Sequence, residues 1–276
     1  MRLTTNLQKR QFSITALNKR HLTNAHPMPL NAIHIKNLRK AYPSHTVLDI
    51  PALEFRAGQL TCVLGATGCG KTTLLNILAG TDQAFSGEVI CAGLPKPRVS
   101  YQFQKDLLLP WKTVRDNLLL GFHISDESMQ NNLADGWLKT LDLEKVARSY
   151  PAALSVGTRQ RISLGRALVW NGDLKLLDEP LSAQDFTRRL SLEALLRLEL
   201  RKPETLAIVV THNLEEAVIL ADRIIILGGQ PARVLDDFEV VGLPEKNRPV
   251  EGRRSPEFAQ YIARAARALS GITTTA

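Results

Sequence analysis

The chain has 276 residues, of which 44% are hydrophobic and 22% charged, and its formal net charge is +8. This length suffices for one large domain or for a domain with a subdomain and tails. No stretch approaches 18 consecutive apolar residues, so the sequence contains no membrane-spanning helix. Its three cysteines lack metal-ligand spacing, which favours reduced thiols over a disulfide framework.

Residues 1–30 form a basic leader that we expect to be disordered. Residues 1–27 carry five basic side chains and no acidic one, and Met28 stands just before the first strand pattern. Such a segment could instead be a transit peptide or an arm that binds nucleic acid. A third alternative is that translation starts at Met28.

The first part of the folded region is rich in strand patterns. Alternation of apolar and polar residues predicts two half-buried antiparallel strands, and a short apolar run predicts a buried strand that leads through a glycine-rich turn into a helix. Two further strands follow. The expected elements are strands 32–38, 46–55 and 59–64, helix 71–80, and strands 87–93 and 98–103.

The second part alternates between helices and strands. Residues 113–150 have helical patterns, and the remaining elements are helix 159–170, strand 174–179, helix 188–201, strand 206–211, helix 213–221, strands 223–229 and 232–240, and an amphipathic helix 255–269. This alternation predicts an α/β fold with a mostly parallel sheet. The early strands predict a small antiparallel β subdomain, and residues 105–155 a helical subdomain.

The sequence Gly-Ala-Thr-Gly-Cys-Gly-Lys-Thr-Thr matches the spacing of a phosphate-binding loop. Glycines at this spacing let backbone N–H groups turn toward phosphates, and the dipole of the following helix favours their negative charge. Lys71 is expected to neutralise the β- and γ-phosphates, and the Thr72 hydroxyl to bind Mg²⁺. The predicted nucleotide-binding residues of this loop are Gly65, Ala66, Thr67, Gly68, Cys69, Gly70, Lys71, Thr72 and Thr73.

Polar side chains at the ends of other predicted strands complete this hypothesis. Asp178 and Glu179 close a buried strand, and we expect Asp178 to hold Mg²⁺ and Glu179 to polarise the attacking water. Gln104 and His212 follow two more strands and are expected near the γ-phosphate, with Gln104 also a candidate Mg²⁺ ligand. Tyr42 precedes the loop in the sequence, where its ring could stack on adenine.

The stretch Leu-Ser-Val-Gly-Thr-Arg-Gln-Arg, residues 154–161, precedes a predicted helix. Ser155 and Gly157 have the residue types that a phosphate contact at a helix start needs. The stretch is therefore a working nucleotide contact, a degenerate one, or a polar turn.

Taken in order, these motifs resemble those of the ATP-binding cassette (ABC) transporter ATPases, over residues 31 to about 240. The resemblance implies a P-loop ATPase domain at 31–245, with residues 246–276 as a C-terminal tail. It implies ATP and Mg²⁺ as cofactors, and a head-to-tail dimer in which each ATP lies between one phosphate loop and the partner's Ser155 segment. The segment after Gln104 would dock a cytoplasmic helix of a transmembrane permease.

Such a protein would lie peripherally on the cytoplasmic face of the cell membrane, as a homodimer, and meet a solute-binding protein only indirectly. The family's usual signature is Leu-Ser-Gly-Gly-Gln, so Val156 and Thr158 depart from it and predict a weaker contact between subunits. Gln184 stands where leucine is common, whereas Asp185 is kept. Residues 107–118 and 214–234 look most like importers of nitrate, sulfonates or taurine, with importers of thiamine precursors or other small solutes as competitors.

Two other classes of nucleotide-binding protein are alternatives to an importer subunit. A soluble ABC ATPase acting on nucleic acid usually has tandem cassettes or a coiled-coil insertion, and the short spacing between Lys71 and Ser155 leaves no room for one. We therefore expect no nucleic-acid partner. A small-metabolite kinase with a phosphate loop would not need the Ser155 segment.

Overall fold

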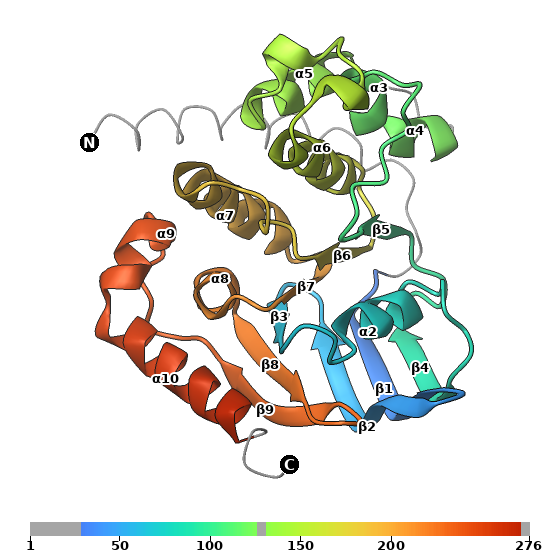
Figure 1. The fold of residues 1–276 in the computed structure, drawn as a ribbon, viewed down its shortest axis with the longest axis vertical. Helices are drawn as coiled ribbons and strands as arrows, with labels where there is room; N and C mark the ends of the chain where they lie inside the picture. Colours follow the sequence, from blue (N-terminus) through green and yellow to red (C-terminus); the bar gives the residue numbers. More distant parts are fainter. Residues whose placement is uncertain (1–28, 126–130, 272–276) are drawn as a thin grey trace. The chain divides into compact units, whose positions relative to one another are not determined.

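The computed structural model describes residues 29–125 and 131–271, so the predicted leader lies outside the described residues. The chain divides into two compact units (Figure 1). We call residues 29–101, 172–179 and 193–271 the sheet unit, and residues 102–125, 131–171 and 180–192 the helical unit.

An antiparallel sheet in the order β2-β1-β4 belongs to the sheet unit. Pro43 and Ser44 form a tight turn between β1 and β2, and Tyr42 pairs with His45 across it. Apolar residues alternate along β1 because only one face of each strand enters the core. The strands are β1 (Ala32–Tyr42), β2 (His45–Arg56) and β4 (Ser86–Ala92).

A second sheet has six strands in the order β5-β6-β7-β3-β8-β9. The pairs β6–β7, β7–β3 and β3–β8 are parallel, and β8–β9 is antiparallel. The central strands are buried along their whole length because both faces are covered, and most of their residues are apolar. The strands are β3 (Leu60–Leu64), β5 (Val99–Gln102), β6 (Leu174–Asp178), β7 (Leu206–Thr211), β8 (Arg223–Gly228) and β9 (Arg233–Glu239).

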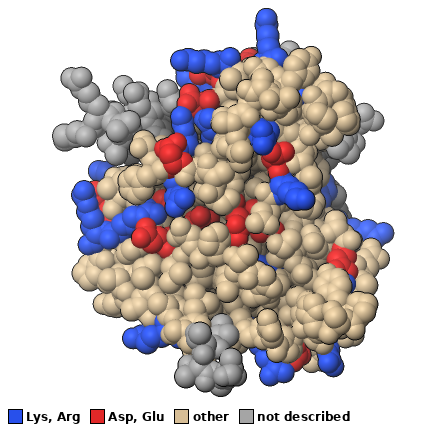
Figure 2. All heavy atoms as spheres, in the orientation of Figure 1, with Lys and Arg blue, Asp and Glu red and all other residues tan. Residues whose placement is uncertain are grey.

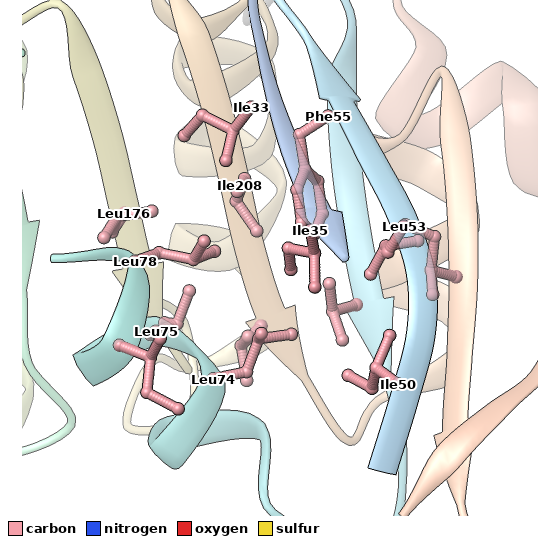
Figure 3. Close-up of a cluster of buried hydrophobic side chains, with 14 of the residues drawn as sticks. Ile33, Ile35, Ile50, Leu53, Phe55, Leu74, Leu75, Leu78, Leu176 and Ile208 are labelled. Carbon is pink, nitrogen blue, oxygen red and sulfur yellow. The ribbon is translucent and has the colours of Figure 1, made fainter. Parts of the chain in front are cut away.

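The core of the sheet unit forms around α2 (Lys71–Leu78). Figure 3 shows Leu74, Leu75 and Leu78 of this helix directed at side chains from both sheets, among them Phe55 and Ile208. Each fully buried leucine stabilises the fold by about 1.5–3 kcal/mol. This packing fixes the helix that begins directly after the predicted phosphate loop.

The helical unit contains four helices of its own among the described residues, and α7 begins in it. The side chain of Asn117 is fully buried, accepts from Leu109 N at 2.8 Å and donates to three backbone carbonyls. It thereby fastens the segment before α3 to that helix. The helices are α3 (Val114–Leu118), α4 (Leu120–Ser125), α5 (Asn131–Thr140), α6 (Val156–Val169) and α7 (Phe186–Leu200), with 3₁₀ turns Glu144–Val146 and Pro151–Ala153.

The C-terminal segment packs on the sheet unit. Tyr261 stacks on Phe238 of β9 with ring centroids 5.8 Å apart, and Arg264 lies over the same ring. The amphipathic helix expected near the C-terminus thus covers the edge strand β9. The remaining helices of the unit are α8 (Leu214–Leu220), α9 (Arg248–Glu251) and α10 (Pro256–Ser270), with a 3₁₀ turn at Gly252–Arg254.

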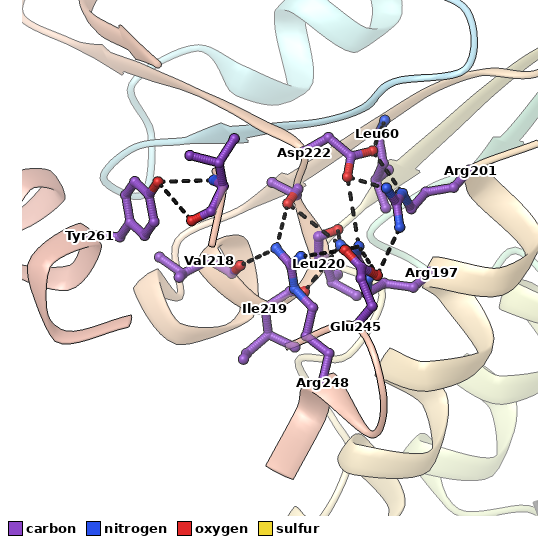
Figure 4. Close-up of polar contacts among 12 residues, drawn as sticks. Leu60, Arg197, Arg201, Val218, Ile219, Leu220, Asp222, Glu245, Arg248 and Tyr261 are labelled. Carbon is purple, nitrogen blue, oxygen red and sulfur yellow. Dashed lines mark hydrogen bonds and ion pairs between the residues drawn. The ribbon is translucent and has the colours of Figure 1, made fainter. Parts of the chain in front are cut away.

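Arginines join the end of α8 to the C-terminal segment (Figure 4). Arg197 donates to Leu220 O at 2.6 Å and to both carboxylate oxygens of Glu245 at 3.0 Å. Arg248 donates to Ala221 O at 2.8 Å, and burial lowers the pKa of its guanidinium to about 10. The two guanidinium groups therefore satisfy backbone carbonyls that the end of a helix leaves without intrahelical partners.

We expect Arg197→Met to lower the free energy of unfolding by about 2–4 kcal/mol, because it leaves buried carbonyl groups without donors. Arg201→Met is the matched control, since Arg201 contacts the same two acids, Asp222 and Glu245, from a more exposed position. It should cost less than about 1 kcal/mol. Urea unfolding of both variants measures the difference. Equal losses in the free energy of unfolding would show that the buried contacts of Arg197 with α8 stabilise the fold no more than the exposed contacts of Arg201 do.

Opposite charges lie next to one another over the face drawn in Figure 2. Several arginines of the sheet unit pair with acids, as Arg223 does with Asp237 and Arg264 with Asp236. Among the described helices, none has the length and apolar character that crossing a membrane requires.

Candidate functional site

The loop from Gly65 to Gly70 connects β3 to α2, and its glycines are demanded by the backbone. A Cβ at Gly65 would lie 2.6 Å from Leu227 O, and Gly70 has φ 108° with its Cβ position 2.8 Å from Leu48 Cδ2. Gly68 has φ 81° and faces open space. The loop therefore turns sharply against the body, while its exposed side has room for a ligand. The helix that follows has no side-chain cap, which leaves its first N–H groups available to an anion.

Lys71 lies beneath this loop. Its side chain is buried, and Nζ donates to Gly65 O and Ala66 O, both at 2.9 Å. These contacts hold the ammonium group at the loop, where its charge favours phosphate oxygens.

Thr72 and Asp178 meet directly. Thr72 Oγ1 donates to Asp178 Oδ2 at 2.7 Å, although the two residues are far apart in the sequence. Burial raises the pKa of Asp178, and the neighbouring Glu179 raises it further, whereas the Thr72 hydrogen bond and Lys71 lower it. A hydroxyl and a carboxylate side by side are hard oxygen donors of the kind that Mg²⁺ binds together with phosphate and water. The donor set thus fits Mg²⁺.

Glu179 turns away from the strand that it follows. Its φ is 50°, and its N–H donates to Val210 O at 2.9 Å. This left-handed turn directly follows β6, and Oε1 of Glu179 lies 2.8 Å from His212 Nδ1, just beyond β7. Topology therefore brings together two side chains that the sequence analysis placed at neighbouring strand ends.

Tyr42 lies at the end of the β1–β2 hairpin and is 45% exposed. Val47 and Leu48 of the same hairpin approach Gly70. The hairpin end is therefore close to the last glycine of the loop, and Lys40 Nζ stands 4.8 Å from the Tyr42 ring centroid. An exposed ring here can stack on a flat ligand.

Ser155 begins α6 in the helical unit. Its Oγ accepts from Thr158 N at 3.3 Å and lies 2.9 Å from Thr158 Oγ1. Val156 is the first residue of the helix and is 60% exposed, so this position requires no positive φ and a β-branched residue costs little. Gly157 is the constrained position, because a Cβ there would lie 2.8 Å from Ala183 O.

The candidate residues thus fall into two groups. The sheet unit holds Tyr42, the loop with Lys71 and Thr72, and the side chains of Asp178, Glu179 and His212. The helical unit holds Ser155, Gly157 and Gln104, which lies exposed in a bend after β5. The structure therefore brings the first group together within one unit, whereas the second group belongs to the other unit.

Sequence reasoning missed one cluster. Gln160, Ser182 and Gln184 form hydrogen bonds between the start of α6 and the loop before α7. The unusual glutamine at position 184 was the available signal, and an amide at a position that usually holds leucine indicates a polar contact.

Comparison with known proteins decides the family. The family model described as ABC transporter matches residues 48–182. An aliphatic sulfonates import ATP-binding protein, SsuB 2 of Burkholderia lata, is 40% identical over 84% of this chain and 84% of its own length. The chain belongs to the ABC transporter ATPase family. The recognition made from the motifs is confirmed, and the chain is an ATPase of this family.

Other similar proteins also match most of this ABC ATPase. SsuB of Yersinia pestis is 35% identical over 87% of this chain and 88% of its own length. A dimeric ATP-binding cassette in a post-hydrolysis state, bound to ADP and phosphate, superposes with a TM-score of 0.67 and 26% identity. It covers 76% of this chain and 100% of its own. This likeness confirms the predicted α/β fold with a parallel core, an antiparallel sheet and helices.

Proposed function

We propose that the chain is the ATP-hydrolysing subunit of an importer for small sulfonates. The contact between Thr72 and Asp178, beside the Glu179–His212 pair, carries the ATPase part of this proposal. The solute class rests on the relatives from Burkholderia and Yersinia, whose names specify import of aliphatic sulfonates. Taurine, itself a sulfonate, falls within the class, whereas nitrate and thiamine precursors do not.

ATP binding is assigned to the sheet unit. The N–H groups of the loop and of the first turn of α2 surround the β- and γ-phosphates, and the Lys71 ammonium neutralises their charge. Tyr42 stacks on the adenine ring from the hairpin end.

Thr72 and Asp178 would hold Mg²⁺. The ion, when bound, neutralises charge on the phosphate oxygens. The Thr72–Asp178 hydrogen bond orients both of these side chains. Occupation of this site would also favour the ionised form of Asp178, against the effect of its burial.

Hydrolysis is assigned to Glu179 and His212. His212 Nδ1, 2.8 Å from Oε1, orients the Glu179 carboxylate, and this carboxylate orients a water molecule for attack on the γ-phosphorus. The water loses its proton toward the carboxylate as its oxygen bonds to phosphorus, and ADP leaves with the electron pair of the broken bond. His212, half-exposed, orients Glu179 and contacts the γ-phosphate.

Two further surfaces belong to this proposal. Ser155 and the N–H of Gly157 contact the γ-phosphate held by a second copy of the chain, in a head-to-tail homodimer. The segment after Gln104 exposes Leu107 at 52% and Trp111 at 70%, and these apolar side chains suit a cytoplasmic helix of a permease. The subunit would then lie peripherally at the cytoplasmic face of the membrane and meet a solute-binding protein only through the permease.

Growth on defined sulfur sources tests the solute class. A strain lacking this gene should fail to grow with an alkanesulfonate as sole sulfur source, and growth should return with the wild-type gene but not with its Glu179→Gln variant. Growth on sulfate is the control and should be unaffected. Normal growth on sulfonates together with loss of growth on nitrate, or a thiamine requirement, would assign another solute.

A further inference from the structure

The first turn of α6 and the loop Leu181–Asp185 are joined by buried amides within the helical unit. The side chain of Gln184 is 8% exposed and that of Gln160 is 6% exposed. Gln184 Nε2 donates to Gly157 O at 3.0 Å and to Gln160 Oε1 at 2.9 Å. A leucine, the residue common at this position, could form neither bond.

Gln160 connects the same two segments from the other side. Its Oε1 also accepts from Ala183 N at 3.0 Å, and its Nε2 donates to Ser182 Oγ at 2.9 Å. Three consecutive residues of the loop therefore contact one side chain of α6. Ser182 and Ala183 are themselves exposed, so these hydrogen bonds, rather than burial of the whole loop, hold it in place.

Close packing restricts the junction further. Ala183 O lies where a Cβ at Gly157 would be, 2.8 Å away, so the loop contacts the backbone of the helix itself. Position 157 is therefore the glycine that this chain needs, whereas the exposed Val156 lies outside the junction. The departure at position 156 and the retained glycine at 157 follow from this one arrangement.

The loop continues into α7 with a defined geometry. Gln184 N donates to Leu181 O at 3.2 Å, which closes a turn, and Asp185 Oδ1 accepts from Arg188 N at 2.9 Å at the start of the helix. Leu181 is fully buried. The two ends of the loop are thus fixed. Between them, the side chain of Gln184 connects the loop to Gly157 and Gln160, which follow Ser155 in the chain.

We propose that Gln184 is a positioning residue that holds the start of α6 so that Ser155 and the N–H of Gly157 are preorganised for phosphate. This role rests on the proposed contact of Ser155 with the nucleotide of a second copy. Preorganised donors bind an anion without first losing conformational freedom, so the amide contacts strengthen dimer closure. They act in place of the signature glutamine that Thr158 replaces.

The test compares Gln184→Met and Gln184→Leu, which keep the approximate volume but remove the amide. The loss of two buried hydrogen bonds should weaken ATP-driven dimerisation by about tenfold. The affinity of the monomer for ATP should be unchanged, because the phosphate loop lies in the sheet unit. Gln83→Met, at an exposed position of the sheet unit, is the matched control and should change neither quantity.

Gln160→Met cuts the same connection from the other side and should give the same split between binding and dimerisation. In the double variant, the loss of dimerisation should be smaller than the sum of the two single losses, because both residues act through one shared contact. Hydrogen exchange of the Ala183 N–H should accelerate in Gln160→Met, because this variant removes its acceptor.

Sedimentation equilibrium with ATP separates the outcomes when every protein also carries Glu179→Gln, so that ATP is not consumed. If Gln184→Met dimerises as well as the Glu179→Gln parent, the role of Gln184 is overturned and the proposed function is left intact. Loss of monomer ATP affinity, or dimerisation losses that only follow the fall in melting temperature, would also overturn this role. Failure of the Glu179→Gln parent itself to dimerise with ATP would instead contradict the proposed function.

Discussion

Glu179→Gln is expected to retain ATP binding and to slow ATP hydrolysis by about a hundredfold or more. The amide has nearly the same shape as the carboxylate, so it keeps the position near His212 Nδ1 but cannot accept a proton from water. Turnover of the purified protein and ATP affinity by equilibrium dialysis measure the two quantities separately. Because hydrolysis is blocked after binding, the variant should accumulate as an ATP-bound dimer.

Glu88→Gln is the matched control, since Glu88 lies exposed on β4 of the same unit. It removes one carboxylate without touching the strand end at Glu179, and it should hydrolyse ATP at the wild-type rate. Near-normal turnover in Glu179→Gln would mean that another group activates the water.

Lys71→Ala should weaken ATP binding by about tenfold or more and lower turnover as well. The reason is the loss of a charged hydrogen-bond donor to phosphate, which contributes about 1.5–3 kcal/mol. The same change also removes the bonds to Gly65 O and Ala66 O that shape the loop. Titration with a fluorescent ATP analogue, beside a turnover assay, measures both effects.

Binding of adenosine distinguishes loss of charge from loss of structure. Adenosine carries no phosphate, so its weaker affinity should be the same in Lys71→Ala and in the wild type. Lys96→Ala, which removes an exposed lysine of the sheet unit, should change neither ligand's affinity. Unchanged ATP affinity in Lys71→Ala would contradict the assignment of the phosphate site to this loop.

The geometry of the predicted phosphate loop and the contacts of the acid pair could be anticipated because local rules determine them. Close approach to the backbone requires a glycine at position 65, and a left-handed φ requires one at position 70. Both glycines therefore appear in the sequence at a fixed spacing. The meeting of Thr72 with Asp178, and of Glu179 with His212, follows from the rule that parallel strands end at one edge.

The amide cluster around Gln160 and Gln184 was not predictable in the same way. It joins side chains far apart in the sequence, and neither periodicity nor spacing records which long-range partner an amide has. The contacts of Arg197 with the end of α8 were not predictable for the same reason, since in the sequence Arg197 looks like an ordinary charged residue of a helix. The prediction that Val156 contributes to a weaker contact between subunits rests on its residue type, whereas the structure places this exposed residue at the first position of helix α6.

Mixed dimers test most directly that each ATP lies between the phosphate loop of one copy and the Ser155 segment of another. Lys71→Ala and Ser155→Arg subunits, both also carrying Glu179→Gln to prevent hydrolysis, are combined, and the ATP retained per dimer is counted. A head-to-tail arrangement puts both lesions in one site and leaves the other intact. We expect one retained ATP per mixed dimer and none in either homodimer. Retention of ATP by the Ser155→Arg homodimer, or none in the mixture while the Glu179→Gln parent retains two, would contradict it.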